Sequence, residues 1–437
     1  RYTSKMEIAK EAQIHKVKEE GSIWLDVLVE RKANHRLTLA ASQSLVASER
    51  FLLRRETCAS SSSSSSESSV SVKEINQKQL QVKGKTYTML FDKDTSQFIS
   101  MLSAQGNRIM SSCDHSFFRA PTDNDNGGLA PDKMGGELIP LLRCVDKVFC
   151  TKLSTEGVGS SSFHSYWRAV GLDTCRTFAL EPINVIKGST LVQEDVVRAV
   201  RGMDGIPTGP PLFRITTTWT FRAASYTMDV KVVAQKAIAH LPSLPRIGVH
   251  MELANDLNLL QYYGKGPHEC YSDRKESAVE GIHQMDIDKC HVQYVVPSEN
   301  GGRCDVQWLS LSSNTVDHRR VRILYTQLDD EEAPAEQPLT GFFIHDGGCV
   351  GDGSKRPAGG KGAQINVSRF SVNELAAANH DDELVRSLDG NVVHLHVDSA
   401  HMGVGGDTGW TPETHHQYRI KAGAGTTWHY TLDFNII

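Results

Sequence analysis

The sequence lacks the long apolar runs, the excess of basic residues and the paired cysteines that mark several large classes of protein. No apolar run approaches the about 20 residues of a membrane-spanning helix, and the first residues contain no apolar core of a signal peptide. Lys and Arg number 47 against 52 Asp and Glu, a formal net charge of −5. We therefore expect neither a nucleic acid nor a membrane as partner. The first residue, Arg1, is not Met, and we interpret the chain as one that begins within a longer protein.

The cysteines form no recognisable framework. There are nine, an odd number, and no two have the C-x-x-C spacing of a zinc or redox site. Free thiols in a reducing compartment are the expected state, so we predict a cytoplasmic protein.

Length and composition predict more than one domain. A chain of 437 residues is too long for one ordinary core, while 39% hydrophobic and 23% charged residues are typical of a globular protein. Residues 58–72 are rich in serine, which cannot bury enough apolar surface to offset chain entropy. We therefore predict a first segment at residues 1–57, a flexible linker at 58–72 and a large domain at 73–437.

Alternating apolar and polar residues dominate both segments and predict β-strands. In the first segment we expect a charged helix within residues 1–20 and strands at 23–30, 37–39 and 51–53, too few to close a sandwich. In the large domain we expect strands at 79–82, 87–91, 98–102, 216–221, 227–233, 246–253, 294–296, 321–325, 393–397 and 428–434. Helices are expected only at 166–171 and after a capping box at Ser371 and Glu374. Many short strands over such a length predict one large antiparallel β-sandwich.

Residues 398–410 are the most informative stretch. The strand predicted at 393–397 runs into a glycine-rich turn that ends at Trp410, which is followed by Thr411 and Pro412. An indole on such a loop suits stacking on the C–H face of a sugar, with its N–H free for a hydroxyl. The alternative is a tryptophan that closes one end of the sandwich core.

Four stretches, in this order, resemble the C-terminal domain of the large β-galactosidases of glycoside hydrolase family 2. They are residues 118–127 (FRAPTDNDNG), 264–274 (GKGPHECYSDR), 297–303 (PSENGGR) and 401–407 (HMGVGGD) with Trp410. The resemblance implies an all-β fold, a large antiparallel supersandwich like that of galactose mutarotase, preceded by a partial immunoglobulin-like β-sandwich segment. It further implies that Trp410 stacks on bound sugar and that Gly127 is the hinge of a mobile loop. Insertions at 127–162 and 347–362 depart from the family pattern.

The same resemblance places the bond-breaking residues elsewhere. Retaining hydrolysis needs two carboxylates roughly 5 Å apart, and in the family these are glutamates of a (β/α)₈ barrel that also holds magnesium and sodium ions. No barrel-like repeat precedes the sandwich in this sequence. We therefore expect no catalytic residue, metal site or cofactor in this chain.

Some other residues could still carry chemistry. Glu269, Asp273 and Glu299 lie on loops, and we interpret them as loop anchors and ion-pair partners, with Asp273 facing Arg274. His394 and His396 share one strand face as metal ligands would, but a third ligand is not evident, and we interpret both as structural.

The sequence thus predicts the C-terminal part, or small subunit, of a β-galactosidase that acts on terminal β-D-galactosides. The expected partners are the β-galactoside, a catalytic barrel domain or large subunit, and further copies in a homo- or hetero-oligomer. Two alternatives remain open: a non-catalytic carbohydrate-binding module, and an aldose-epimerase-like enzyme, for which no converging His and Glu can be identified.

Overall fold

The computed structural model describes most of the predicted large domain and two strands before it. Side chains and backbone are described for residues 70–126, 162–183, 189–200, 205–313, 320–327, 362–384, 392–406 and 414–436, and backbone alone for 22–31, 44–55, 184–187 and 328. The chain divides into two compact units, residues 1–65 with 334–343 and residues 66–333 with 344–437.

The first unit contains an antiparallel pair, β1 (Ser22–Arg31) and β2 (Ser44–Arg55). These confirm the strands expected at 23–30 and 51–53. The expected helix within 1–20, the strand at 37–39 and nearly all of the serine-rich segment lie outside the described residues. The immunoglobulin-like assignment of residues 1–57 and the linker at 58–72 stay predictions.

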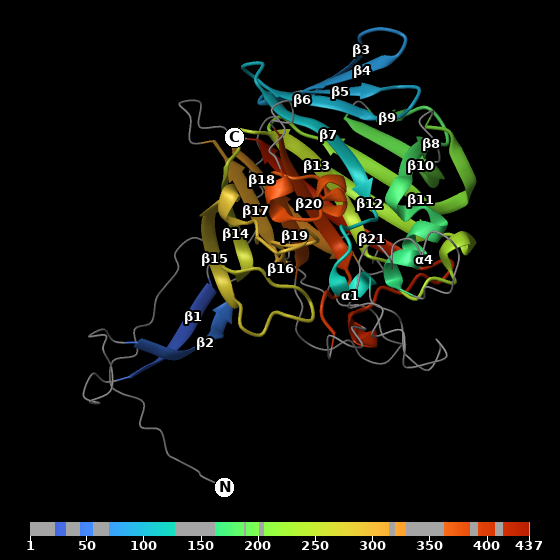
Figure 1. Ribbon diagram of the computed structural model, residues 1–437. Helices are drawn as coiled ribbons and strands as arrows, with labels where there is room; N and C mark the ends of the chain where they lie inside the picture. The colour runs from blue at the N-terminus through green and yellow to red at the C-terminus, as the bar shows by residue number, and fades with distance from the viewer. Residues whose placement is uncertain are drawn as a thin grey trace, which may run out of the picture. The chain divides into compact units, whose positions relative to one another are not determined.

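The second unit is built from two antiparallel sheets, shown in Figure 1. In spatial order the first sheet contains β15 (Val279–Asp286), β14 (Leu259–Gly266), β17 (Trp308–Ser312), β18 (Arg320–Leu328), β21 (Thr427–Ile436), β12 (Ser225–Ala234), β11 (Pro207–Phe221), β10 (Thr190–Val200) and β8 (Cys175–Ala179), with β9 (Asn184–Lys187) also paired to β10. The second contains β16 (Arg303–Val306), β19 (Ala363–Ser368), β20 (Val392–His401), β13 (Arg246–Ala254), β7 (Arg108–Ser116), β6 (Phe98–Ser103), β5 (Tyr87–Asp92), β4 (Gln79–Lys83) and β3 (Ser71–Glu74).

Alternation along the strands builds the core between the sheets. On β5, Tyr87, Met89 and Phe91 are buried while the residues between them are partly exposed. The Phe91 ring meets Trp219 of the opposite sheet edge-on, with ring centroids 5.4 Å apart. Because each strand offers one apolar face, burying these faces against each other is the main stabilising term. The predicted fold, an all-β antiparallel supersandwich, is confirmed.

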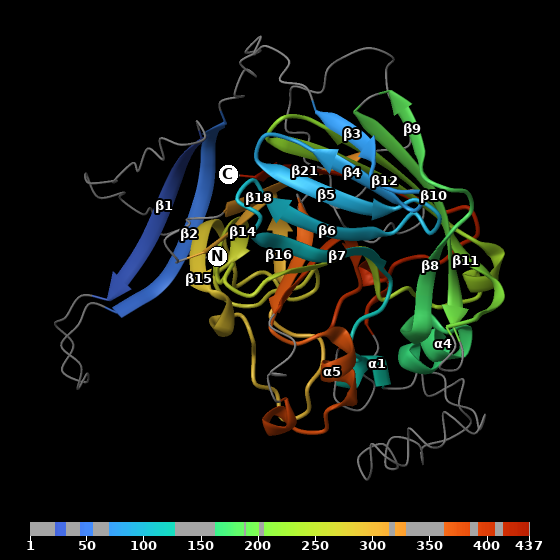
Figure 2. The same cartoon turned by 90° about the horizontal axis from the view of Figure 1, so that it is seen from above.

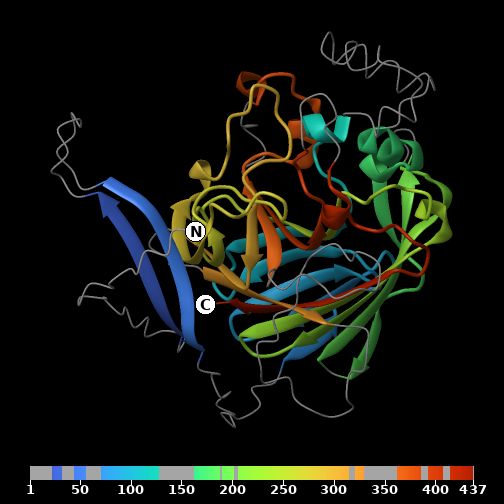
Figure 3. The ribbon, with the colours of Figure 1, turned by 90° about the horizontal axis from the view of Figure 1, so that it is seen from below.

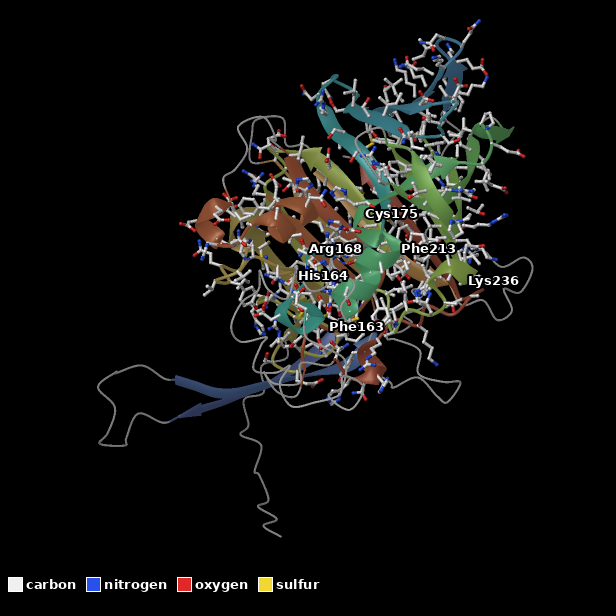
Figure 4. All side chains as sticks on the ribbon, turned by 45° about the vertical axis from the view of Figure 1, so that its right-hand side comes forward. Phe163, His164, Arg168, Cys175, Phe213 and Lys236 are labelled. Carbon is white, nitrogen blue, oxygen red and sulfur yellow. The ribbon has the colours of Figure 1, made fainter. Side chains whose placement is uncertain are left out.

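Both predicted helices are present. Ser162 caps α4 (Phe163–Val170), and Gly171 ends it with a positive φ of 78°, a conformation that glycine adopts without strain. Figure 4 labels Phe163, His164 and Arg168 along this helix. The predicted capping box of Ser371 and Glu374 opens α5 (Val372–Ala377). Within the described ranges, no helix is both long and apolar enough to cross a membrane.

One predicted strand is wrong. Tyr294 belongs to no strand, residues 295 and 296 form bends, and the Val295 side chain is 81% exposed. The Tyr294 hydroxyl bonds Glu269, and Pro297, which has no N–H, follows at once. The segment therefore leaves the sheet despite its β-branched residues. It belongs to the loops on the side of the double sheet that also holds α5 and the short α1 (Asp123–Asn126), seen in Figures 2 and 3.

A buried carboxylate on β10 makes stability depend on pH. Burial raises the pKa of Asp195 to about 7, from an ordinary value near 3.8. The folded state therefore holds this proton more tightly than the unfolded chain, and the stability gained is full below about pH 4 and lost as pH rises through 7. Asp195→Asn should raise the free energy of unfolding at pH 8 by on the order of 3 kcal/mol, with little gain at pH 4.

Urea unfolding of wild type and Asp195→Asn between pH 4 and 8 measures this difference. The exposed Asp94→Asn is the matched control, because it removes a carboxylate that is not buried. A parallel pH profile for wild type and Asp195→Asn would contradict the prediction.

Candidate functional site

The four sequence motifs, far apart in the chain, meet at the loops that follow β7, β14 and β20 and precede β16. Their meeting point is a set of buried polar side chains, which we call the charge cluster. Its members are all at most 5% exposed: Arg119, Asp125, Arg246, Tyr271, Glu299, Asp398 and His401. Burying so many charges is costly unless each is paired and hydrogen-bonded, so the pairing shows what the cluster holds in place.

Arg119 connects the first motif to the fourth. Its guanidinium donates to both carboxylate oxygens of Asp125, at 3.1 and 2.7 Å, in a bidentate pair. It also donates to the carbonyl oxygens of Met402 at 2.5 Å and Gly403 at 2.9 Å. Asp125 lies on α1 and accepts the Thr122 N–H at 3.0 Å, so the local turn holds the carboxylate in position. Both partners of the ion pair have fully buried side chains.

Arg246 connects β13 and β20 to the third motif. It lies 3.3 Å from Glu299 and 3.2 Å from Asp398. Glu299 also accepts hydrogen bonds from the Tyr271 hydroxyl at 3.4 Å and the Asn366 side-chain amide at 3.1 Å. Burial raises the pKa of Asp398 to about 7, while the Arg246 guanidinium opposes that shift. The second and third motifs therefore share one buried acceptor, Glu299.

Asp273 of the second motif holds the glycine turn of the fourth. Its carboxylate accepts the backbone N–H of Val404 at 3.1 Å and of Gly405 at 2.7 Å. A Cβ on Gly403 would lie 2.5 Å from the same carboxylate, so only glycine allows this approach. Residues 402–406, the anchored turn, are thus bonded through their carbonyls by Arg119 and through their amides by Asp273.

The expected pairing of Asp273 with Arg274 is wrong. Arg274 pairs with Glu269 instead. Glu269 also accepts the Gly301 N–H at 2.7 Å and a hydrogen bond from the Tyr294 hydroxyl. Asp273 does not pair with Arg274 because both of its carboxylate oxygens accept hydrogen bonds from the backbone N–H groups of Val404 and Gly405. All three candidate carboxylates, Glu269, Asp273 and Glu299, accept hydrogen bonds that fasten loops.

The two residues that the sequence analysis assigns to sugar binding and loop motion fall beyond the described part of the chain. Trp410 follows the anchored turn by four residues, and Gly127 follows α1 directly. Both roles stay predictions. Where the two segments begin is described: Asn124 of α1 donates to the carbonyl of Val404 at 2.5 Å. The two described stretches that lead to Gly127 and Trp410 are therefore joined by a hydrogen bond.

The structure brings together one pair of residues that the sequence did not predict. His401 Nε2 lies 3.7 Å from a Glu299 oxygen, although about a hundred residues separate them. Both side chains are 3% exposed, so a sugar cannot reach them in this conformation. Burial, together with the guanidinium groups of Arg119 and Arg246, holds the pKa of His401 well below its usual range. Glu299 lies in the third motif and His401 in the fourth, and this shared membership is the feature of the sequence that could have predicted their proximity.

His394 and His396 join a third imidazole, His250 of β13. The ring centroid of His250 lies 5.2 Å from that of His394 and 4.5 Å from that of His396, and both pairs of rings are stacked. Burial lowers the pKa of His250 to about 3 and also lowers that of the other two. In the described part of the chain, no group of three or more His, Cys, Asp or Glu could hold a metal ion. Neutral, stacked rings fit the structural role expected for His394 and His396.

Gly248 of β13 leaves room for the side chain of Asp398, its partner on the neighbouring strand β20. A Cβ at this position would lie 2.5 Å from the carbonyl oxygen of Val397 and closer still to the Asp398 carboxylate. Gly248→Ala should lower the free energy of unfolding by about 1–3 kcal/mol, because the added methyl forces apart well-packed strands. Thermal unfolding measures the loss. In the control Gly423→Ala the methyl would meet the Thr426 hydroxyl at 3.2 Å, and equal losses in the two variants would contradict the argument.

Comparison with known proteins adds an independent observation. A family model described as "Beta galactosidase small chain" matches residues 83–434. The chain is 24% identical to a β-galactosidase of Pseudoalteromonas haloplanktis over 388 residues, which is 87% of this chain and 30% of that protein. It is 23% identical to one of Oenococcus oeni, over 90% of this chain and 31% of the relative. It thus spans less than a third of the length of these relatives.

Solved structures with a similar course of the chain share little sequence with it. A putative aldose 1-epimerase from Escherichia coli K12 has a TM-score of 0.39 and 8% identity, over 84% of this chain and 99% of the other. A galactose mutarotase-like protein from Lactobacillus casei has a TM-score of 0.37 and 8% identity, over 82% of this chain and 100% of the other.

Proposed function

The chain belongs to the β-galactosidase small-chain family, and from this premise we propose that it is the C-terminal part, or the small subunit, of an enzyme that hydrolyses terminal β-D-galactosides. Its role there is to close the sugar site of a catalytic barrel and to present Trp410 to the bound sugar. One observation carries the proposal: the first and second motifs hold the anchored turn of the fourth, residues 402–406, which leads to Trp410, and the third joins the same charge cluster through Glu299.

In this proposal the chain contributes to the sugar site by positioning Trp410 through the anchored turn. Two carbonyls are fixed by a buried guanidinium and two amides by one carboxylate. A loop with its backbone held in this way delivers the residue that follows it with little loss of conformational entropy on binding. Trp410 then supplies a flat apolar surface for the sugar's C–H face and an indole N–H for a hydroxyl.

The bond-breaking acids belong to a partner barrel, whether on the same polypeptide or on a large subunit. The candidate carboxylates Glu269, Asp273 and Glu299 accept hydrogen bonds that fasten loops, which supports a structural role for all three. The family's magnesium and sodium ions belong to that barrel as well, and assembly into a homo- or hetero-oligomer in the cytoplasm is part of the proposal.

The test is reconstitution. The chain alone, a barrel-bearing partner alone and their mixture are assayed with a chromogenic galactoside. We expect hydrolysis to rise strongly only in the mixture, because the catalytic pair and the sugar-stacking residue then share one site. Hydrolysis by the chain alone would overturn the division of roles, and a mixture no better than the partner alone would overturn the proposed cap.

The two alternatives lead to different results. Tight galactose binding by the isolated chain, followed by tryptophan fluorescence and abolished by Trp410→Ala, is the expected behaviour of a carbohydrate-binding module. Accelerated exchange of galactose anomers in NMR is expected of an epimerase. The burial of His401 and Glu299 argues against the second alternative, since that chemistry needs both groups in an open cleft.

A further inference from the structure

A pocket of about 580 Å³ lies outside the charge cluster. It opens between the segment around residues 287–295 and the segment around residues 369–384, which includes α5. In Figures 2 and 3 α5 lies on the same side of the double sheet as α1, where the four motifs meet. The volume is in the range of small-ligand sites and accommodates a mono- or disaccharide.

The lining of the pocket combines apolar and hydrogen-bonding surfaces. Apolar surface comes from Phe370 and from Ile287, Val295 and Leu384, while Tyr294 adds a second ring. Carboxylates come from Asp288, Asp381 and Asp382, and Arg369 and His291 add nitrogen donors. A sugar has the matching composition, with an apolar C–H face and hydroxyl edges that both donate and accept.

The polar groups are held in place before any ligand binds. His291 Nε2 lies 2.7 Å from Asp381, and its ring meets Phe370 edge-on at 5.2 Å. Arg369 donates to Asp288 at 3.0 Å and to the carbonyl oxygen of Asn255 at 3.0 Å. Groups fixed in this way lose little conformational entropy on binding, which favours a hydroxyl-rich ligand of modest size.

The charges narrow the class of ligand. Three carboxylates face one guanidinium and one imidazole, so a phosphate or other anion would be repelled. A bare cation would have to displace the existing partners of Asp288 and Asp381, Arg369 and His291. A purely apolar ligand would leave these charged groups desolvated without new hydrogen bonds. A neutral polyhydroxylated molecule avoids these costs, because its hydroxyls can donate to the carboxylates and accept from Arg369 and His291.

The pocket shares its wall with the motifs. The backbone N–H of Val292 donates to Asn300 of the third motif at 3.1 Å. The hydroxyl of Tyr294, which lines the pocket, bonds Glu269 of the second motif, and Glu269 in turn accepts the Gly301 N–H. Occupancy of the pocket therefore bears on the same loops that hold the charge cluster.

We propose that this pocket is a second saccharide subsite, one that binds a neutral sugar residue independently of Trp410. The choice of a galactoside as its ligand rests on the proposed function, whereas the hydroxyl-binding chemistry follows from the lining alone. Such a subsite holds a further sugar unit of a larger substrate on the side of the double sheet where the four motifs meet.

The experiment is saturation-transfer difference NMR on the full chain, with lactose and free galactose as probes. Val295→Arg is the main variant, because this side chain is 81% exposed at the pocket, and a guanidinium there pairs with the lining carboxylates of Asp381 and Asp382 and fills the space. Ile75→Arg, at a position 51% exposed directly after β3, is the matched control. Phe370→Ala removes the apolar wall, and Trp410→Ala reports on the separate Trp410 site.

We expect signals in wild type, Ile75→Arg and Trp410→Ala, and a fall of about tenfold in Val295→Arg and Phe370→Ala. Absence of signal in wild type at millimolar sugar, or signal unchanged in Val295→Arg, would overturn the subsite. Reconstituted hydrolysis tests the proposed function separately. Hydrolysis without pocket binding overturns the subsite alone, and pocket binding without reconstituted hydrolysis overturns the galactosidase role alone.

Discussion

Arg119→Met should lower the free energy of unfolding by about 3–5 kcal/mol, the largest stability loss we expect from a single substitution in this chain. The methionine fills similar volume but leaves the Asp125 carboxylate, 0% exposed, without its cation. The carbonyls of Met402 and Gly403 lose their donor in the same step. Urea unfolding at pH 7, followed by tryptophan fluorescence, measures the loss.

Arg168→Met is the matched control for this prediction. Arg168 pairs with Asp173 at 3.5 Å, five residues away where Asp125 is six from Arg119, but the two side chains are 41% and 25% exposed. Solvent screens such a pair, so its loss should cost less than about 1 kcal/mol. Equal losses in Arg119→Met and Arg168→Met would mean that burial does not set the strength of the Arg119 pair.

Asp273→Ala should lower kcat/KM of the reconstituted galactosidase by about 10–100-fold, because small displacements of a positioning group are costly. The variant removes the acceptor of the Val404 and Gly405 N–H groups and frees the anchored turn that leads to Trp410. Galactoside hydrolysis measures the effect. Asp273→Asn keeps one acceptor oxygen and should lose less, while the exposed Asp94→Ala should leave activity unchanged.

The double variant separates positioning from general damage. If Asp273 acts through Trp410, then Asp273→Ala combined with Trp410→Ala should be no worse than Trp410→Ala alone. Independent contributions would multiply. A multiplied loss, or a loss in Asp273→Ala that reflects only a smaller folded fraction, would show that the turn does not position Trp410.

Local patterns predicted the strands because alternation is a property of neighbouring residues. The alternation alone predicts that Tyr87, Met89 and Phe91 share one face of a strand, and the structure buries all three. The capping box at Ser371 is equally local, since both of its hydrogen bonds span three residues. The four motifs identified the loops that meet, because they match a known family in order.

Partners across long sequence distances could not be predicted in this way. Asp273 was assigned to its neighbour Arg274, yet its amide partners lie more than a hundred residues along the chain, at Val404 and Gly405. Nothing in local composition specifies that distance. The same holds for Val295, whose β-branched neighbourhood favours a strand. Beside it, the Tyr294 hydroxyl bonds Glu269, a contact between residues 25 positions apart that local composition does not specify.

The position of β21 bears on how the protein is made in the cell. This strand, dark red in Figure 1, follows the others in the chain but lies between β18 and β12, inside the first sheet rather than at its edge. A ribosome releases residues 427–436 after every other described strand. The edges of β12 and β18 that pair with β21 therefore stay unpaired until then. During that interval the unpaired edges of β12 and β18 can pair with other chains, which is a general cause of aggregation during folding.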